Sequence, residues 1–435
     1  MTAPTYDALL DDARARDAAD PLRRFRDEFL LPEHEGRPAL YFCGNSLGLQ
    51  PKGVAAAVQI ELDDWARLGV EGHFRGRNPW VDYHRRLAEP LGRIVGARPG
   101  EVVAMNALTV NLHLLLVSFY RPTAGRYKII VEGGAFPSDQ YALASQVRHH
   151  GFDPDDAIVE LHPRPGEHGL RTEDITAAIG QTGEALALVM MGGVNYYTGQ
   201  WFDLPAITAA GHKVGATVGF DLAHAAGNVV LNLHDWNVDF AAWCTYKYLN
   251  SGPGGVAGAF VHERHARAFD LPRFAGWWGH DEATRFRMDK IFRPMPGAEG
   301  WQLSNAPILA MAAHRAALDV FDAAGGMGPL RKKSEALTGY LYHLLRDVPG
   351  VRVITPADPA ARGCQLSLLT GEDGRAQYER LARAGVVVDR REPNVIRVAP
   401  TPLYNTFEEA YRFARLLRGE TAPVSSVSDG SDAAG

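Results

Sequence analysis

The amino-acid sequence predicts an α/β protein with a large domain and a smaller α+β domain. Between about residues 51 and 300, short apolar segments typical of buried parallel strands alternate with segments of helical periodicity. After residue 300 the pattern changes to long helices followed by several short strands, which is typical of an α+β domain. A chain of 435 residues also exceeds the roughly 250 to 300 residues at which one hydrophobic core stops growing.

The predicted domain limits follow these changes of pattern. Residues 1–50 contain a helical segment to about Leu31 and a turn-rich passage, and we expect them to pack with the small domain. Residues 51–300 form the predicted large domain and residues 301–418 the small one. Residues 419–435 are small and polar, so we expect a disordered tail.

The elements of the large domain are predicted from apolar periodicity, in chain order. Helices are expected at 54–68, 82–97, 105–120, 172–180 and 203–215. Strands are expected at 127–134, 156–161, 185–194, 216–224 and 254–263. These strands predict a mostly parallel sheet covered by helices on both faces, and such sheets bind ligands beyond the carboxyl ends of their strands. Residues that end a strand are therefore candidates for a site.

The small domain is expected to begin with two long helices, at 306–325 and 329–348. Strands are expected after them at 351–356, 364–370, 386–392 and 395–400, with one more helix among them. We find no internal repeat that would indicate a solenoid or a propeller.

Composition excludes several classes of partner. The formal net charge of −6 and the pI of about 6.2 argue against a nucleic-acid or anionic-membrane surface, which usually needs a basic patch. The three cysteines, Cys43, Cys244 and Cys364, have no C-x-x-C spacing, so we expect neither a disulfide framework nor a zinc site. The N-terminus is polar and acidic, and no apolar stretch approaches the roughly 18 residues of a membrane span. We expect a cytoplasmic protein with a small-molecule ligand.

One lysine stands out in the apolar and aromatic stretch "CTYKYLNSGPGG", because burial disfavours a charged ammonium group. This residue is Lys247, and it follows Asp221, which ends the predicted strand "TVGFD", and His224. A buried lysine and a carboxylate at a strand end suit pyridoxal phosphate, which binds the lysine covalently and whose pyridine nitrogen the carboxylate keeps protonated. On this pattern alone, structural or surface roles for both residues are the favoured interpretation. A metal site at His224 and His234 is disfavoured, because their spacing does not orient two imidazoles.

Two further segments suit a flat, phosphate-bearing cofactor. Leu108 and Thr109 begin an apolar helix, whose N-terminus can bind a phosphate. Phe136 follows a strand in "GGAFPSDQY", where its ring can lie against a cofactor. Thr109 as a simple helix start and Phe136 as a core residue are the structural alternatives.

The sequence closely resembles the kynureninase family over nearly its whole length, apart from the first two dozen residues and the tail. The motifs that carry the resemblance are "YFCGNSLGLQPK", "MNALTVNLHLLLVSFY", "AFPSDQYA", "YYTGQWFDLPAIT", "VGFDLAHAAGN", "LHDWNVDFAAWCTYKYLNSGPGG", "GWWGH", "QLSNAPI" and "IRVAPTPLYN". Kynureninases are homodimeric fold-type-I enzymes that depend on pyridoxal phosphate. They cleave kynurenine or 3-hydroxykynurenine hydrolytically between Cβ and Cγ, which gives alanine and anthranilate or 3-hydroxyanthranilate, in tryptophan degradation or NAD biosynthesis.

The resemblance implies a role for each matching residue. Lys247 is the implied catalytic lysine, and Tyr246 is either a proton-transfer group or a phosphate ligand. Implied cofactor contacts are Leu108, Thr109, Phe136, Pro137, Ser138, Asp139, Asp221, His224, Tyr246, Lys247, Trp277 and Asn305. Implied substrate contacts are Arg397, His73, Ser304, Asn305, Ser46 and His280. Arginine suits the substrate α-carboxylate because its guanidinium presents two parallel donors.

The resemblance also raises questions of specificity. His73, Ser304 and Asn305 resemble the form of the family that prefers 3-hydroxykynurenine, because polar groups can bind the extra hydroxyl. Residues of "GWWGH" and "QLSN" are expected to reach the cofactor of a partner subunit. Gly192 departs from the family pattern, since many relatives carry serine or threonine there and this chain lacks that hydroxyl.

Other functions on the same fold remain as alternatives. A cysteine desulfurase or selenocysteine lyase needs a positioned cysteine, for which Cys364 is the candidate in the small domain. A small-residue aminotransferase and a catalytically silent binding protein are the others. The presence of Lys247, Asp221 and Arg397 disfavours the silent protein.

Overall fold

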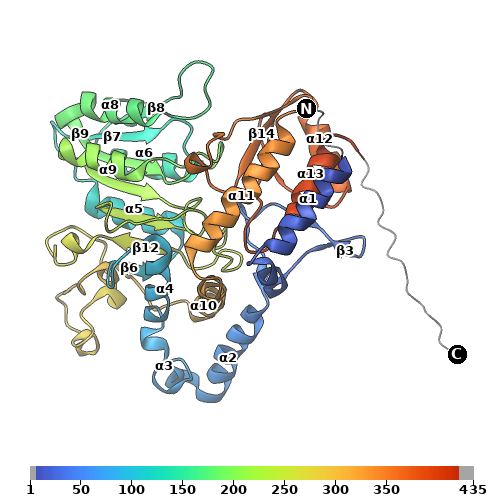
Figure 1. Cartoon of the computed structure of the whole chain (residues 1–435). Helices are drawn as coiled ribbons and strands as arrows, with labels where there is room; N and C mark the ends of the chain where they lie inside the picture. Colours follow the sequence, from blue (N-terminus) through green and yellow to red (C-terminus); the bar gives the residue numbers. More distant parts are fainter. Residues whose placement is uncertain (1–5, 421–435) are drawn as a thin grey trace.

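The computed structural model describes residues 6–420, and its large sheet has seven strands in the order β6-β12-β11-β10-β9-β7-β8 (Figure 1). The strands are β6 (Val102–Ala104), β7 (Lys128–Glu132), β8 (Ile158–Leu161), β9 (Leu186–Gly192), β10 (Thr217–Asp221), β11 (Phe240–Trp243) and β12 (Gly258–Val261). Every neighbouring pair is parallel except the two pairs that β12 makes. The predicted mostly parallel α/β fold is confirmed.

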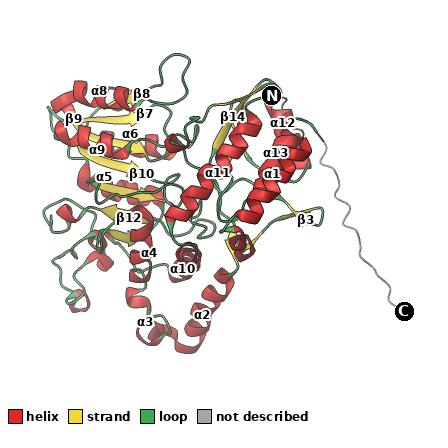
Figure 2. Cartoon of the chain, viewed as in Figure 1, coloured by secondary structure: helices red, strands yellow, loops and turns green. Residues whose placement is uncertain are grey.

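Alternate residues of the central strands enter different hydrophobic cores, as the two-residue period of a strand requires. Ile129 and Val131 pack in a core with helices α5 (Leu108–Phe119) and α6 (Pro137–His149). Ile130, between them in sequence, packs in the other core. That second core includes side chains of α4 (Arg85–Val95), α8 (Thr172–Thr182) and α9 (Leu204–Lys213). The sheet is therefore covered on both faces by helices (Figure 2).

The expected helices and strands of the large domain are all present, and the structure adds helix α6, two short α-helices and two strands. The added strands are β6 and β11. Both are short and lie within longer apolar stretches, where periodicity does not separate a strand from its surroundings. β11 has a functional consequence, because it ends four residues before Lys247.

The C-terminal sheet is antiparallel, in the order β13-β14-β17-β16. Its strands are β13 (Val351–Val353), β14 (Leu366–Thr370), β16 (Asp389–Arg391) and β17 (Val395–Val398), and its helices are α11 (Met327–Leu345), α12 (Gly374–Arg383) and α13 (Phe407–Leu417). The single strand expected at 386–392 is divided. Its first part, β15 (Val386–Val387), leaves this sheet and pairs in parallel with β4 (Leu40–Tyr41).

The N-terminal residues contact the C-terminal helices. Helix α1 (Tyr6–Ala19) packs against α13, and the Asp17 carboxylate accepts hydrogen bonds from the amides of Phe407 and Glu408 at 2.8 and 2.9 Å. These are the first amides of α13, which have no partner within the helix. An acidic side chain from α1 thus caps α13.

The remaining elements complete the chain. Short strands and helices are β1 (Phe29–Leu30), β2 (Glu33–His34), β3 (Arg37–Pro38), β5 (Gln50–Pro51), α3 (Gly72–Arg75) and α7 (Pro154–Ala157). Helix α10 (Ile308–Ala323) packs against α4 and α2 (Gly53–Leu68). Within residues 6–420, no helix is both long and apolar enough to span a membrane. The predicted domain limits stay predictions, and the expected tail lies outside the described residues from 421 onward.

Candidate active site

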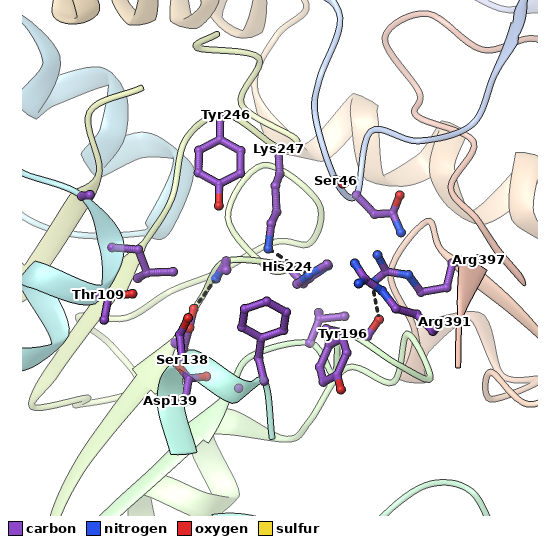
Figure 3. A pocket seen from close by; sticks show the side chains of 18 of the residues that line it. Ser46, Thr109, Ser138, Asp139, Tyr196, His224, Tyr246, Lys247, Arg391 and Arg397 are labelled. Atoms are coloured by element: carbon purple, nitrogen blue, oxygen red, sulfur yellow. Dashed lines mark hydrogen bonds between the residues drawn. The ribbon is translucent and has the colours of Figure 1, made fainter. Parts of the chain in front are cut away.

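A cavity of about 340 Å³ lies where the carboxyl ends of three adjacent strands meet. β7 ends there at Glu132, β9 at Gly192 and β10 at Asp221. This is the position that an open parallel sheet offers to a ligand. The lining residues are Asn45, Ser46, Ala107, Leu108, Thr109, Glu132, Phe136, Ser138, Asp139, Gly192, Val194, Tyr196, Asp221, Ala223, His224, Tyr246, Lys247, Gly254, Gly255, Arg391 and Arg397 (Figure 3).

Lys247 extends into this cavity from the loop after β11 (Figure 3). Its Nζ lies 3.0 Å from Nε2 of His224 and 5.8 Å from the ring centroid of Phe136. Burial, with the positive charge of Lys247 second, holds the pKa of His224 well below its ordinary value. The imidazole is therefore neutral at neutral pH, and its Nε2 accepts the hydrogen bond from the lysine.

The lysine loop is held by the N-terminal segment. The Gly48 amide donates to the Tyr246 carbonyl at 2.8 Å, so this segment contacts the loop directly beside the lysine. A β-carbon on Gly48 would lie 2.3 Å from both the Lys247 carbonyl oxygen and Oδ1 of Asn250. Glycine is required there because real β-carbons do not approach other atoms so closely.

Three buried carboxyl groups lie at the sheet side of the cavity. Asp221 accepts the Ala223 amide at 2.7 Å, and Asp139 forms a side-chain hydrogen bond with it. Burial, and then the negative charge of Asp221, raises the pKa of Asp139 well above its usual range. Burial also raises the pKa of Glu132, to about 7. Burial raises the pKa of Asp221 as well, so protonation of these two neighbouring carboxyl groups is linked.

The helices α5 and α6 begin beside the cavity. Leu108 and Thr109 are the first residues of α5, while Ser138 and Asp139 lie in the first turn of α6, which Pro137 begins. The first amides of a helix have no intrahelical acceptor and carry partial positive charge. The cavity therefore offers two helix N-termini to an anionic group.

Arg397 lies opposite the sheet, on β17 of the C-terminal part. It is fully buried, and its Nε and Nη2 both donate to the Asp389 carboxylate, the first of these at 2.7 Å. Its Nη1 donates to the Tyr196 carbonyl at 2.7 Å. A guanidinium has five N–H groups and these contacts use three of them, so two remain for a ligand. Ser46 lines the same side, from the loop after β4.

In the part of the chain that the structure describes, the remaining predicted site residues lie outside the lining of the cavity. They are His73, Pro137, Trp277, His280, Ser304 and Asn305. Trp277 and His280 line a separate cavity of about 320 Å³, where the Trp277 indole donates to the Arg285 carbonyl. Ser304 and Asn305 are exposed. His73 hydrogen-bonds the Val70 carbonyl at 3.0 Å.

The site also contains residues that the sequence analysis did not identify. Asn45, Glu132, Tyr196 and Arg391 all line the cavity. Glu132 lies near the end of the strand predicted at 127–134, so its position was a usable signal. The ring of Tyr196 packs edge-on against Phe136 at 5.2 Å. Arg391 reaches the cavity from the C-terminal sheet, and spacing along the chain does not reveal such a contact.

The two histidines weighed as a metal pair are separated. His224 lies in the cavity, whereas His234 hydrogen-bonds Glu101 at 2.9 Å and stacks on His262. Amides of Glu263 and Arg98 also donate to Glu101, and the Arg264 amide donates to His262. Both carboxylate oxygens of Glu101, Nδ1 of His234 and Nδ1 of His262 thus take part in hydrogen bonds.

Comparison with known proteins agrees with the geometry. Residues 330–417 match the family model of the kynureninase C-terminal domain. A kynureninase of Myxococcus xanthus is 59% identical over 423 residues, covering 96% of this chain and 99% of the relative. Kynureninases of Stenotrophomonas maltophilia and Nematostella vectensis are 58% and 52% identical, covering 92% of this chain and 96% and 91% of theirs.

Solved structures with a similar fold are more distant in sequence. A cystine C-S lyase in complex with cysteine persulfide is 17% identical, with a TM-score of 0.74 over 88% of this chain and 98% of its own. The cysteine desulfurase CsdA of Escherichia coli is 18% identical, with a TM-score of 0.73 over 92% and 99%. These structures share the fold. The sequence relatives, identical at more than half of the aligned positions over nearly their whole length, show that the chain belongs to the kynureninase family.

Proposed function

We propose that this protein is a pyridoxal-phosphate-dependent kynureninase, a hydrolase that cleaves the Cβ–Cγ bond of L-kynurenine or L-3-hydroxykynurenine. The products are L-alanine and anthranilate or 3-hydroxyanthranilate, which belong to tryptophan degradation or NAD biosynthesis. One observation carries the proposal. The amine of Lys247 lies beside the neutral imidazole of His224, in a cavity at the strand ends.

The residues of the cavity suit the cofactor. Nδ1 of His224 and Oδ1 of Asp139 are buried and have no hydrogen-bond partner among the described residues. The N-termini of α5 and α6 suit a phosphate, and the Phe136 ring suits a flat heterocycle. When bound, pyridoxal phosphate supplies a conjugated ring that takes up the negative charge left at the substrate Cα.

Protein groups have separate roles in the reaction. Lys247 binds the cofactor and, once free, moves the proton at the substrate Cα. Asp221 pairs with the pyridine nitrogen, and Asp139 forms a hydrogen bond with Asp221. Arg397 binds the substrate α-carboxylate with the two N–H groups left over from Asp389 and Tyr196.

Tyr246 is proposed as the proton donor to the reacting carbons, with phosphate binding as the alternative. Burial, followed by the Cys244 thiol, raises the pKa of its phenol, which stays protonated at neutral pH and can donate. Steady-state kinetics and a cofactor titration of Tyr246→Phe distinguish the roles. Loss of a proton donor lowers kcat with cofactor affinity unchanged, whereas loss of a phosphate ligand weakens cofactor binding.

A sulfur-transfer function is disfavoured by the cysteines. Burial raises the pKa of Cys43 to about 11 and that of Cys364 to about 12. Burial also raises the pKa of Cys244. A nucleophilic cysteine needs the opposite shift, and none of the three lines the cavity.

A homodimer is the proposed assembly. Large apolar side chains are exposed along residues 269–291, namely Phe269, Phe274, Trp277, Phe286, Met288 and Ile291. Exposed apolar groups at this density are typical of a protein interface. In the dimer, His73, Trp277, His280, Ser304 and Asn305 are proposed to reach the cavity of the partner, with His73, Ser304 and Asn305 favouring the 3-hydroxylated substrate. Mixing Lys247→Ala with Trp277→Ala tests this, because a hybrid dimer would have one complete site and regain activity.

Absorbance between about 300 and 500 nm, before and after addition of each substrate, tests the function itself. The wild type is expected to show a visible cofactor band and to release alanine with the aryl acid, and Lys247→Ala to lack the band. A protein that remains colourless with added pyridoxal phosphate would contradict the proposal. A cytoplasmic location is proposed as well, and fractionation of cells checks it.

A further inference from the structure

Arg391 is a second guanidinium in the cavity, next to Arg397 (Figure 3). It belongs to β16, one of the two edge strands of the C-terminal sheet. Side chains two residues apart on a strand lie on the same face, so Asp389 and Arg391 share one face of β16. The register of the sheet places Asp389 directly opposite Arg397 on β17. The fold therefore places Arg397, Asp389 and Arg391 in one row, with the carboxylate between the two guanidinium groups.

The charges in this row do not cancel. Asp389 accepts Nε and Nη2 of Arg397 and, at 3.0 Å, Nη2 of Arg391. One carboxylate thus serves two guanidinium groups, which leaves one positive charge beside the cavity. The positive charges of Arg397 and Arg391 also reach His224, whose pKa they help to lower. An anion of charge −1 would neutralise the excess.

Arg391 also has unused hydrogen-bonding capacity. Its Nε is buried and has no partner within the described part of the chain, although a buried donor without an acceptor is unfavourable. Among residues 6–420, the Arg391 side chain makes one hydrogen bond, to Asp389. Arg397 has two N–H groups left, so Arg391 has the larger free capacity.

We propose that Arg391 is a second substrate-binding cation, which holds the amino-acid carboxylate together with Arg397 while Asp389 positions both guanidinium groups. This inference rests on the proposed function and adds a residue to it. An amino-acid carboxylate fits because it carries one negative charge and two oxygens, one for each arginine. Bound from both sides, the carboxylate fixes the orientation of the substrate Cα toward Lys247.

Neighbouring Arg390 provides a matched control. It lies on the same strand, faces the other side and pairs with Glu392 and the Pro393 carbonyl. Arg390→Gln therefore removes the same charge from the same strand without touching the row. Arg391→Lys keeps the charge and loses the planar fork, so it separates charge from geometry.

The test measures inhibition of the holoenzyme by L-alanine and by anthranilate, with substrate KM and cofactor affinity measured in parallel. Arg391→Gln is expected to weaken alanine binding and raise KM by about tenfold or more, as loss of a charged hydrogen bond implies, with Arg391→Lys in between. Anthranilate inhibition, cofactor affinity and Arg390→Gln are expected to match the wild type.

Three results would overturn the inference: unchanged alanine inhibition in Arg391→Gln, a loss confined to anthranilate, or a loss confined to the cofactor. The second would place the aryl carboxylate at Arg391, and the third the phosphate. Absence of substrate cleavage by the wild type is a separate result, because it would contradict the proposed function instead.

Discussion

Glu132 and Gly192 are joined across the ends of neighbouring strands, because the Gly192 amide donates to both carboxylate oxygens of Glu132, at 3.1 and 3.0 Å. A β-carbon at residue 192 would lie 2.8 Å from Oε1 of Glu132. The absence of a hydroxyl-bearing side chain at residue 192 thus has a structural reason. The space beside residue 192 is filled by a carboxyl group that also lines the cavity.

Gly192→Ala is expected to destabilise the protein by about 1 to 3 kcal/mol, because the new methyl group overpacks against Glu132. Urea unfolding of the single variants and of the Gly192→Ala, Glu132→Ala double variant measures this. The double variant should lose less stability than the two single variants combined. Losses that add within about 0.5 kcal/mol would show that the two positions are not in conflict.

Gly48→Ala is expected to lower kcat/KM by tenfold or more, on the order of 1.4 kcal/mol, because its β-carbon would displace the Lys247 carbonyl and hence the loop. Gly53→Ala is the matched control, since a β-carbon there meets no atom within 4 Å. Steady-state kinetics of both variants checks the expectation. Equal kinetics in the two would mean that the lysine loop tolerates the contact.

His314 makes stability depend on pH. It is fully buried, neither ring nitrogen has a partner in the described chain, and burial lowers its pKa to about 3. The unfolded chain takes up the proton near pH 6.5, so stability is complete above that pH and falls as the pH drops from 6.5 toward 3. Between pH 6.5 and pH 5 the loss should be about 2 kcal/mol.

Replacing this histidine tests the assignment. His314→Leu is expected to remove that part of the pH dependence, as measured by urea unfolding at pH 5 and pH 7. A wild-type slope retained in His314→Leu would assign the acid sensitivity to other groups.

Lys333 and Asp20 form a buried ion pair at 2.7 Å between α11 and the residue after α1. Lys333→Met is expected to destabilise the protein by about 3 to 5 kcal/mol, because it leaves the Asp20 carboxylate buried without a counter-charge. The Lys333→Met, Asp20→Leu double variant should recover most of the loss. Thermal unfolding compares the three, and a double variant no better than the single would exclude the unpaired charge as the cause.

Much of the fold could be predicted because most of its large-sheet strands are distinct apolar segments separated by helices of clear periodicity. β9 and α5 are examples. β11 could not, because four apolar residues within a longer apolar stretch have no distinct period. The division of 386–392 into β15 and β16 depends on a partner strand almost 350 residues earlier, β4, which no local pattern contains.

The site was predictable where it depends on strand ends. Asp221, His224 and Lys247 come together because β10 and the loop after β11 end at the same edge of the sheet. Arg391 and Tyr196 were missed, because they arrive from a different sheet and from a loop. Alternation along β16, once its partner strand is known, is enough to put Asp389 and Arg391 on one face.

The segment from β4 to Gly48 is anchored at both ends. β4 pairs with β15 at its start, and Gly48 donates to the Tyr246 carbonyl at its end. Fewer than ten residues of chain therefore act as a short tether between the C-terminal part and the lysine loop. Any rigid-body rotation of the C-terminal part pulls on the backbone beside Lys247, so hydrogen exchange of the Gly48 amide reports on such motion from a distance.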